Sequence, residues 1–255
     1  MPRNLKLTLA YDGHDFAGWQ VQPDRLSVQG TLVSAFEHLT GEKTLPQGSG
    51  RTDAGVHALA QIATVLTDSP IPVDNLVRAL NDVLPRSIRV LAAEEMPPEF
   101  HARRSAIAKT YRYHIYRGAI CSPFQARYVY HHPYPLDESR MIEAAALVEG
   151  EHDFTSFAAV DPERGKDRSK ESLEPNNVRT IFQSHWQRHA DELVYTVRGN
   201  GFLHHMVRNL VGTFLMVGKG SLTVADVRRI LELRDRSAAV ATAPASGLFL
   251  VNVEY

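Results

Sequence analysis

The chain is organised around an eight-residue stretch, Gly50-Arg51-Thr52-Asp53-Ala54-Gly55-Val56-His57. This stretch combines two glycines with a cation, a hydroxyl, a carboxylate and an imidazole, which is unsuited to the interior of a helix or strand. Glycine adopts backbone conformations closed to other residues, so the stretch predicts a shaped loop that approaches another surface or a ligand closely. Asp53 then has two interpretations, an Asx-type turn bonded to its own backbone or the chemical group of a site.

The sequence around this loop predicts the order β-α-β-β-α-β for the first hundred residues. Leucines alternate with polar residues at 4–11, and Ser27 is a credible N-cap for a helix that ends at Gly41. A loop with three aromatic residues at 11–20 is either a packed turn or a surface that faces a ligand. The remaining predicted elements are a short strand at 43–47, strands at 58–66 and 88–92, and a helix at 74–84.

The second half repeats this order without repeating the sequence. It predicts a strand at 105–116, a hairpin at 178–198, helices at 202–217 and 223–233, and a last strand at 248–253. A further helix at 137–148 would turn Met141, Ile142, Ala145 and Val148 inward.

We therefore expect an α+β fold of two ferredoxin-like halves, 1–100 and 101–255. The halves would share a mixed, mainly antiparallel sheet with helices on one side, and a central active-site cleft would lie between them. Residues 161–177 are charged and nearly free of apolar side chains, which predicts an insertion.

Composition narrows the class of protein. The 28 basic and 29 acidic residues nearly cancel, so a nucleic-acid partner would have to be met by a local basic patch. Cys121 is the single cysteine, which excludes an internal disulfide and favours a reducing compartment. No run approaches the roughly 18 to 20 apolar residues of a membrane span, and residues 1–12 lack the apolar core of a secretion signal. We expect a cytoplasmic protein without membrane contact.

A locally basic and aromatic strand stands out in this neutral chain. Between His101 and Gly118 the sequence has no acid, and it carries five cations and three tyrosines, namely Arg103, Arg104, Lys109, Tyr111, Arg112, Tyr113, Tyr116 and Arg117. Tyrosines in a cationic groove can stack on unpaired bases at roughly 1 to 3 kcal/mol per base. The alternative is a strand whose tyrosines pack in the core while its arginines are solvated.

The predicted helix at 202–217 is apolar nearly all round and carries Arg208 in its middle. A buried cation needs a carboxylate partner. The partner is either part of a structural salt bridge or Asp53, which a nearby cation would keep ionised as a nucleophile. His204 and His205 are adjacent, so their side chains diverge on a helix, and no other ligand accompanies them at metal-binding spacing. No metal site is expected.

Six motifs, taken together and in order, resemble those of the tRNA pseudouridine synthase A family and cover almost the whole chain. They are the 50–57 stretch, Tyr11-Asp12-Gly13 with Gly18-Trp19-Gln20, Phe100-His101-Ala102-Arg103, Lys109-Thr110-Tyr111-Arg112-Tyr113, His152-Asp153-Phe154-Thr155-Ser156-Phe157, and Phe202-Leu203-His204-His205-Met206-Val207-Arg208-Asn209.

The resemblance implies that a homodimer without a cofactor isomerises uridine at positions 38, 39 and 40 of the tRNA anticodon stem and loop. By motif position Asp53 would be the nucleophile, Tyr111 would stack on the target base, Arg208 would pair with Asp53, and Arg51 would place the flipped nucleotide. Arg103 and Arg112 are expected to contact the RNA. Two rival classes are a non-catalytic RNA-binding protein, which offers no reason for Arg51, Asp53 and Arg208 together, and a metal-dependent hydrolase, which needs converging histidines.

Overall fold

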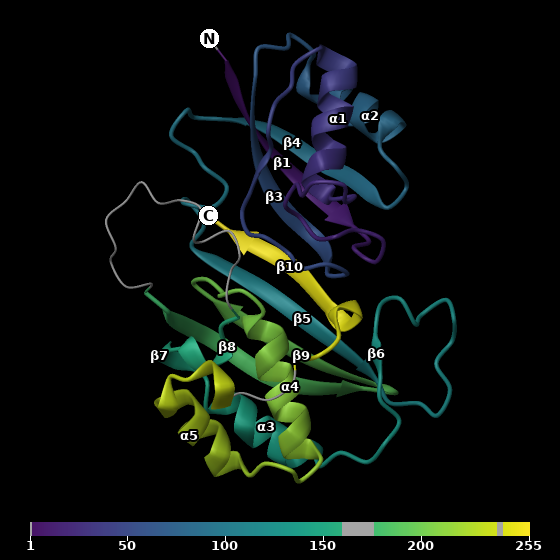
Figure 1. Cartoon of the computed structure of the whole chain (residues 1–255). Coiled ribbons are helices and arrows are strands. Elements are labelled where there is room, and N and C mark those ends of the chain that lie inside the picture. Colours follow the sequence, from purple (N-terminus) through teal and green to yellow (C-terminus); the bar gives the residue numbers. More distant parts are fainter. Residues whose placement is uncertain (1, 160–175, 239–241) are drawn as a thin grey trace. The chain divides into compact units, whose positions relative to one another are not determined.

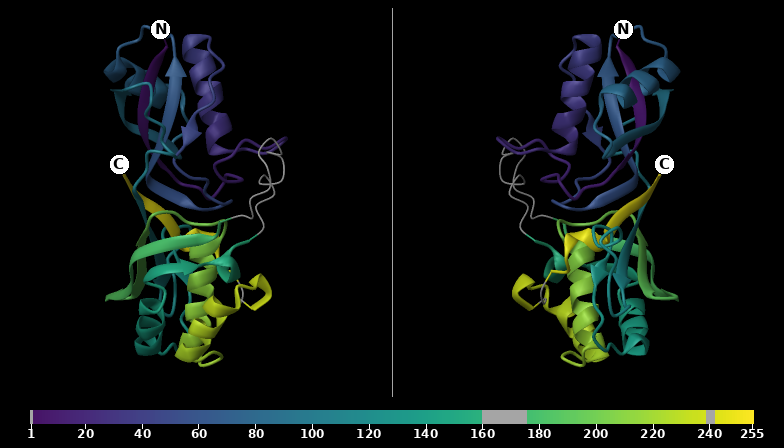
Figure 2. Two further views of the ribbon diagram at one scale, coloured as in Figure 1. Left: turned by 90° about the vertical axis from the view of Figure 1, so that its left-hand side faces the viewer. Right: turned by 90° about the vertical axis from the view of Figure 1, so that its right-hand side faces the viewer.

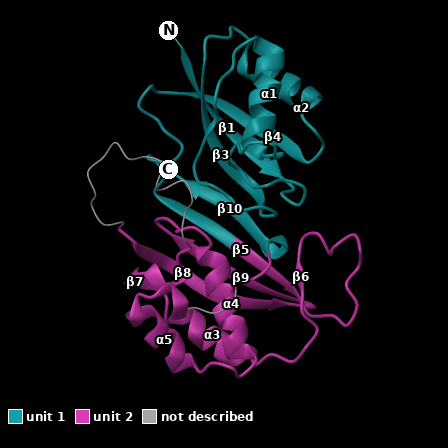
Figure 3. Cartoon of the chain, viewed as in Figure 1, with its two compact units in different colours: residues 1–111, 245–255 teal, residues 112–244 magenta. Residues whose placement is uncertain are grey.

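The structure, a computed structural model, describes residues 2–159, 176–238 and 242–255 and divides into two compact units (Figure 3). Unit 1 comprises Met1–Tyr111 and Ala245–Tyr255, and unit 2 comprises Arg112–Pro244. The charged insertion predicted at 161–177 lies outside the described residues except for its last two positions. The division into ferredoxin-like halves at residue 100 and the cleft between them stay predictions.

Unit 1 is built on strand β1 (Arg3–Tyr11), whose leucines at alternate positions 5, 7 and 9 are fully buried. This strand pairs antiparallel with β3 (His57–Thr67) on one side and β4 (Ile88–Met96) on the other. Strand β2 (Gln47–Gly48) adds a short antiparallel pair to β3, and β10 (Leu248–Glu254) pairs with β3 in parallel. The alternation read from the sequence thus marks the buried face of this unit.

Two helices, α1 (Val28–Thr40) and α2 (Val73–Val83), lie side by side against one face of the strands of unit 1 (Figure 1, Figure 2). The predicted capping of α1 is confirmed, because the Ser27 side chain accepts a hydrogen bond from the Gly30 N–H and Gly41 ends the helix at φ 73°.

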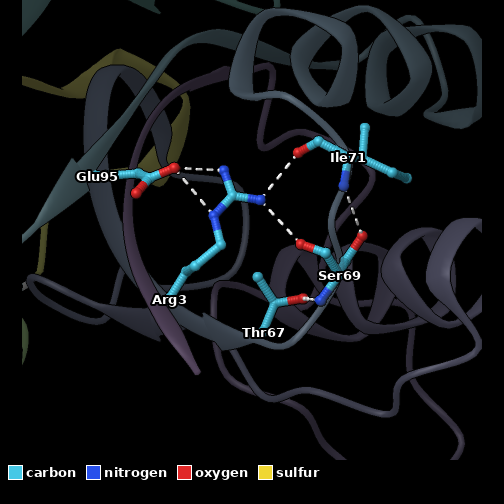
Figure 4. A network of polar contacts seen from close by, with 5 residues as sticks. All are labelled: Arg3, Thr67, Ser69, Ile71 and Glu95. Atoms are coloured by element: carbon cyan, nitrogen blue, oxygen red, sulfur yellow. Dashed lines mark hydrogen bonds and ion pairs between the residues drawn. The ribbon is translucent and has the colours of Figure 1, made fainter. Parts of the chain in front are cut away.

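The first residue of β1 ties three segments of unit 1 together (Figure 4). The guanidinium of Arg3 donates from Nε to Glu95 of β4 at 2.9 Å. Its Nη1 donates to the carbonyl oxygens of Ser69 and Ile71, which follow β3, at 2.8 and 2.9 Å. One side chain therefore holds the edge of the sheet to the segment that leads into α2.

Unit 2 contains the hairpin of β8 (Val178–His189) and β9 (Glu192–Gly199). Strand β7 (Gly150–Asp153) pairs antiparallel with β8, and β5 (Ala108–Tyr116), whose residues from 112 onward belong to this unit, pairs in parallel with β6 (Tyr130–His131). Helices α3 (Glu138–Ala146) and α4 (Met206–Gly218) pack together on these strands, and α5 (Val224–Leu233) packs against α3 (Figure 1). Short 3-10 helices occupy Thr155–Phe157 (η1) and Arg236–Ala238 (η2) here, and Ala245–Gly247 (η3) in unit 1.

The predicted fold class is confirmed, because the strands pair mainly antiparallel and the helices of each unit cover one face of its strands. None of the helices in the described ranges has the length and hydropathy that a membrane crossing requires.

Several predicted boundaries are wrong for local reasons. The strand expected at 43–47 shrinks to Gln47–Gly48, because Pro46 has no N–H to donate to a ladder. Residues 101–105 form a turn closed by a hydrogen bond from Ser105 N–H to the His101 carbonyl, so β5 begins only at Ala108. Ile142, expected to face inward, is 48% exposed.

The last strand also departs from the expected arrangement. It was expected to close the second half, but β10 belongs to unit 1 and pairs with β3 beside the 50–57 loop.

Candidate active site

The 50–57 loop is held in place by the 11–20 loop of the same unit. Trp19 N–H donates to the Thr52 carbonyl at 3.0 Å, and Gly55 N–H donates to the Phe16 carbonyl at 3.2 Å. Phe16 and Trp19 are buried. Both of these aromatic residues of the 11–20 loop are thus packed and support the 50–57 loop, and Trp19 and Gln20 also line a pocket.

Gly18 is required where the two loops meet. Its φ of +100° is one that side chains rarely adopt, and a Cβ there would lie 2.5 Å from the Thr52 carbonyl oxygen. Gly13 is similarly placed, since its Cβ would overlap the Val56 carbonyl. Gly13 and Gly18 of the 11–20 loop thus allow the backbone of the 50–57 loop to approach closely.

We expect Gly18→Ala to lower the free energy of unfolding by about 2–4 kcal/mol and to reduce activity, because it adds crowding to an unfavourable backbone conformation. The matched control is Gly41→Ala, which also has a positive φ (+73°) but has no atom within 4 Å of the Cβ position. That variant should lose only about 1 kcal/mol and keep its activity. Urea unfolding of both proteins checks this, and equal losses would contradict the close-contact explanation.

A network of hydrogen bonds between buried polar side chains supports the 50–57 loop. The Tyr11 hydroxyl shares a hydrogen bond with Thr52 Oγ1 at 2.8 Å, and Ser49 Oγ donates to Gln61 Oε1 at 2.7 Å. Gln61 Nε2 donates in turn to the Gly50 carbonyl at 2.9 Å. Burial raises the pKa of Tyr11 to about 12, so its hydroxyl stays protonated at neutral pH. The network fixes the start of the loop to strands β1 and β3.

Strand β5 contributes two further side chains, Lys109 and Tyr111, to the candidate site. Lys109 Nζ donates to the Ser49 carbonyl at 2.6 Å. Tyr111 is 7% exposed, and burial raises its pKa, with the charges of Tyr11 and Asp53 adding to the shift. Asp53 itself is half-buried and forms a turn in which its carbonyl accepts from the Val56 N–H at 3.1 Å. The structure therefore places the predicted nucleophile within electrostatic reach of the predicted stacking residue.

His57 holds the C-terminal end of the 50–57 loop in place. Its ring is buried and stacks on Phe249 of β10 with centroids 4.7 Å apart. Nδ1 accepts a hydrogen bond from the Gly13 N–H at 3.1 Å and lies 3.1 Å from an Asp12 carboxylate oxygen. His57 thus joins the 11–20 loop to the end of the 50–57 loop and is a structural member of the site.

The supporting roles of Ser49, Gln61 and Lys109 were not predicted from the sequence. A signal for Gln61 was present, since it is an amide side chain with apolar residues on both sides in its strand. Such a residue usually has buried partners. Ser49 and Lys109 gave no comparable signal, because their contacts join strands that are distant in the sequence.

The predicted RNA-contacting arginines are distributed over both units. Arg51 and Arg103 line a pocket of about 350 Å³ in unit 1, together with Arg104 and Trp19. Arg51 Nε also donates to Gln20 Oε1 at 3.2 Å. Arg112 is exposed on the part of β5 that belongs to unit 2.

Arg208 lies in unit 2, in the first turn of α4 and not in the middle of a helix. The helix starts late because His205 adopts a left-handed conformation (φ 59°) immediately before it. Arg208 is half-buried, donates from Nε to the Ala243 carbonyl at 2.8 Å, and opposes with its charge the rise that burial causes in the pKa of Tyr113. Its pairing with Asp53 stays a prediction.

Comparison with known proteins gives one family. A family model described as tRNA pseudouridine synthase matches residues 8–103 and 144–255. The tRNA pseudouridine synthase A of Solibacter usitatus (strain Ellin6076) is 53% identical over 253 residues, which cover 99% of this chain and 100% of that protein. The proteins of the same name from Latilactobacillus sakei subsp. sakei (strain 23K) and Brevibacillus brevis are 42% and 44% identical, and each is matched over its full length.

Among solved structures, a chain of a Cbf5-Nop10-Gar1 complex aligns with 82% of this chain and 53% of its own length. Its identity of 11% and TM-score of 0.33 are too low to support an argument. The chain belongs to the tRNA pseudouridine synthase family.

Proposed function

We propose that this tRNA pseudouridine synthase isomerises uridine to pseudouridine at positions 38, 39 and 40 of the anticodon stem and loop, with Asp53 as the nucleophile. The full-length similarity to tRNA pseudouridine synthases A supports the substrate and the reaction. The observation that carries the assignment of Asp53 is its position in unit 1. It is the one carboxylate in a loop that β1, β3, β5 and the 11–20 loop all hold in place.

The reaction explains why one carboxylate is enough. The C1'–N1 bond must break, the base must rotate, and a C1'–C5 bond must form, with the C5 proton lost and a proton taken up at N1. An ionised carboxylate can start this sequence by adding to the ring at C6 or by attacking C1'. Neither route transfers electrons to an acceptor or consumes water in the overall balance, so the residues have no organic cofactor to hold. We also propose that no metal takes part.

Tyr111 and the arginines have supporting roles in the proposal. The target base must leave the helical stack at a cost of a few kcal/mol, and stacking on an aromatic ring returns a similar amount. Tyr111 is buried, and burial raises the pKa of its hydroxyl, so its ring stays uncharged. Arg51 would place the flipped nucleotide, Arg103 and Arg112 would bind the RNA backbone, and Arg208 would balance the charge of Asp53.

We further propose that the protein acts in the cytoplasm and, as its resemblance to the family implies, as a homodimer. Light scattering coupled to size-exclusion chromatography would test the assembly. A mass of twice 28.5 kDa is expected, and a mass of 28.5 kDa at micromolar concentration would contradict the dimer.

The experiment for the proposed reaction is tritium release from tRNA that carries the label at uridine C5, with EDTA present throughout. Because C5 loses its hydrogen when it bonds to C1', we expect about one tritium released per uridine modified. Release that needs added divalent metal would contradict the cofactor-free mechanism. A folded, tRNA-binding protein that releases no tritium would favour the non-catalytic RNA-binding class.

A further inference from the structure

The pocket in unit 1 is distinct from the Asp53 turn but shares the backbone of the 50–57 loop with it. Gly50 and Arg51 form part of its wall, and Arg103, Arg104 and His101 come from the 101–105 turn. Its volume of about 350 Å³ is within the range of small-ligand pockets, roughly 300–1,000 Å³, and exceeds what a bare inorganic ion needs.

The charged side chains that line this pocket are all positive. Three arginines line it, and none of its lining residues, all within the part of the chain that the structure describes, is an aspartate or glutamate. Arg103 and Arg104 are exposed. A forked guanidinium suits a phosphate, which it can meet with two parallel hydrogen bonds. The electrostatics therefore select an anion of the phosphodiester type.

The turn that carries Arg103 and Arg104 is fixed before any ligand arrives. His101 Nδ1 accepts hydrogen bonds from the backbone N–H groups of Arg103 and Arg104 at 3.0 and 3.4 Å. Ala102 is held on both sides, since its N–H donates to Thr64 Oγ1 at 3.2 Å and its carbonyl accepts from the Tyr255 hydroxyl at 2.8 Å. Such preorganisation lowers the entropy cost of binding.

The other wall of the pocket is aromatic and amide in character. The Trp19 ring is held tightly, because a Cβ added at Gly48 would lie 2.6 Å from the indole. Gln29 fixes the segment beyond it, with its side chain accepting from Val21 N–H at 3.0 Å and donating to the Pro46 carbonyl at 2.8 Å. Amide groups beside an arginine cluster provide both donors and acceptors for a ribose or a base edge.

We propose that this pocket binds the nucleotide that flanks the target uridine in the RNA strand, with Arg103 and Arg104 binding its phosphate and Arg51, in the wall shared with the 50–57 loop, placing the flipped nucleotide. The inference rests on the proposed function. Arg51 and Asp53 are two residues apart, so their Cα atoms are separated by at most about 7 Å. A ligand that fills the pocket and continues past Arg51 therefore reaches the loop that carries the nucleophile.

The first test uses Trp19 as a reporter of the pocket. The chain has two tryptophans, and Trp186→Phe leaves Trp19 as the only one. This replacement is conservative, because the buried Trp186 Nε1 has no hydrogen-bond partner among the described residues. Titration with uridine 5'-monophosphate should change Trp19 fluorescence saturably, and uridine without a phosphate should bind at least about 10-fold more weakly. Equal affinity for the two probes would overturn the proposal.

The second test compares Arg103→Ala/Arg104→Ala with Arg86→Ala, an exposed arginine of unit 1 that does not line the pocket. The double variant should bind tRNA about 10-fold more weakly and reduce the slope of log K against log salt by about 1 to 2, since each lost phosphate contact removes close to one unit. The control should match the parent. An unchanged slope in the double variant would overturn the proposal.

Different results would contradict the pocket proposal and the proposed reaction. If the parent releases tritium and the double variant keeps the affinity and slope of the Arg86→Ala control, the pocket proposal is wrong and the isomerase stands. If no tritium is released but uridine 5'-monophosphate saturates the Trp19 signal, the proposed reaction is wrong, and the pocket binds a nucleotide of an RNA that the protein does not modify.

Discussion

Asp53→Asn is expected to abolish tritium release from C5-labelled tRNA, with a loss of about 10⁴-fold or more, while tRNA binding persists. Removing the nucleophile of a covalent mechanism typically has an effect of this size. The shape of the loop should survive the change, because the Asp53 turn is closed by a backbone hydrogen bond to Val56 and the surrounding contacts use Thr52, Gly50 and Gly55. Of the cations that we assign to RNA binding, Arg103 and Arg104 lie on a separate turn at 101–105 and Arg112 lies on β5.

Two controls separate chemistry from folding in this experiment. Filter binding of labelled tRNA by Asp53→Asn should give a Kd within about 3-fold of the parent value, since one charge is lost at a site that contacts a single nucleotide. Asp53→Ala should be equally inactive. If Asp53→Asn still released tritium at the parent rate, the carboxylate would not be the nucleophile.

Local signals in the sequence were sufficient for much of unit 1. Ser27 and Gly41 bracket α1 as capping chemistry requires, and the alternating leucines of β1 are the buried ones. Residues 50–56 form a loop, as the glycines and polar side chains of the 50–57 stretch predicted, and His57 begins β3. These features depend on neighbours within a few residues along the chain, which is why a sequence pattern carries them.

Features that depend on distant residues were not predicted. Lys109 reaches the Ser49 carbonyl across 60 positions, and His57 stacks on Phe249 near the end of the chain. The parallel pairing of β10 with β3 likewise follows from tertiary packing, since the sequence of β10 marks it as a strand but does not name its partner. The hydrogen bonds that support the 50–57 loop could therefore not be predicted from the sequence.

Arg208→Met is the second change from which we expect a large effect. If Arg208 balances the charge of Asp53, its loss should lower the rate of tritium release by about 10²- to 10³-fold, as removal of an electrostatic partner at a reacting centre does. Arg208→Lys should recover part of this loss, because it keeps the charge but cannot reproduce the guanidinium fork or its bond to the Ala243 carbonyl. The control is Arg188→Met, which breaks an exposed ion pair with Glu138 at 2.9 Å and should change neither activity nor, by more than about 0.5 kcal/mol, stability.

A double-mutant cycle then isolates the pairing of Arg208 with Asp53. The free energies of unfolding in urea are measured for the parent, Asp53→Asn, Arg208→Met and the double variant. Paired side chains should show a coupling energy of about 1–2 kcal/mol, because the second substitution removes a partner that has already lost its contact. The bond from Arg208 Nε to Ala243 is lost in both variants that lack Arg208, so it cancels in the cycle. Additive effects within about 0.3 kcal/mol would show that Arg208 acts only through its own unit, on Tyr113 and the Ala243 backbone.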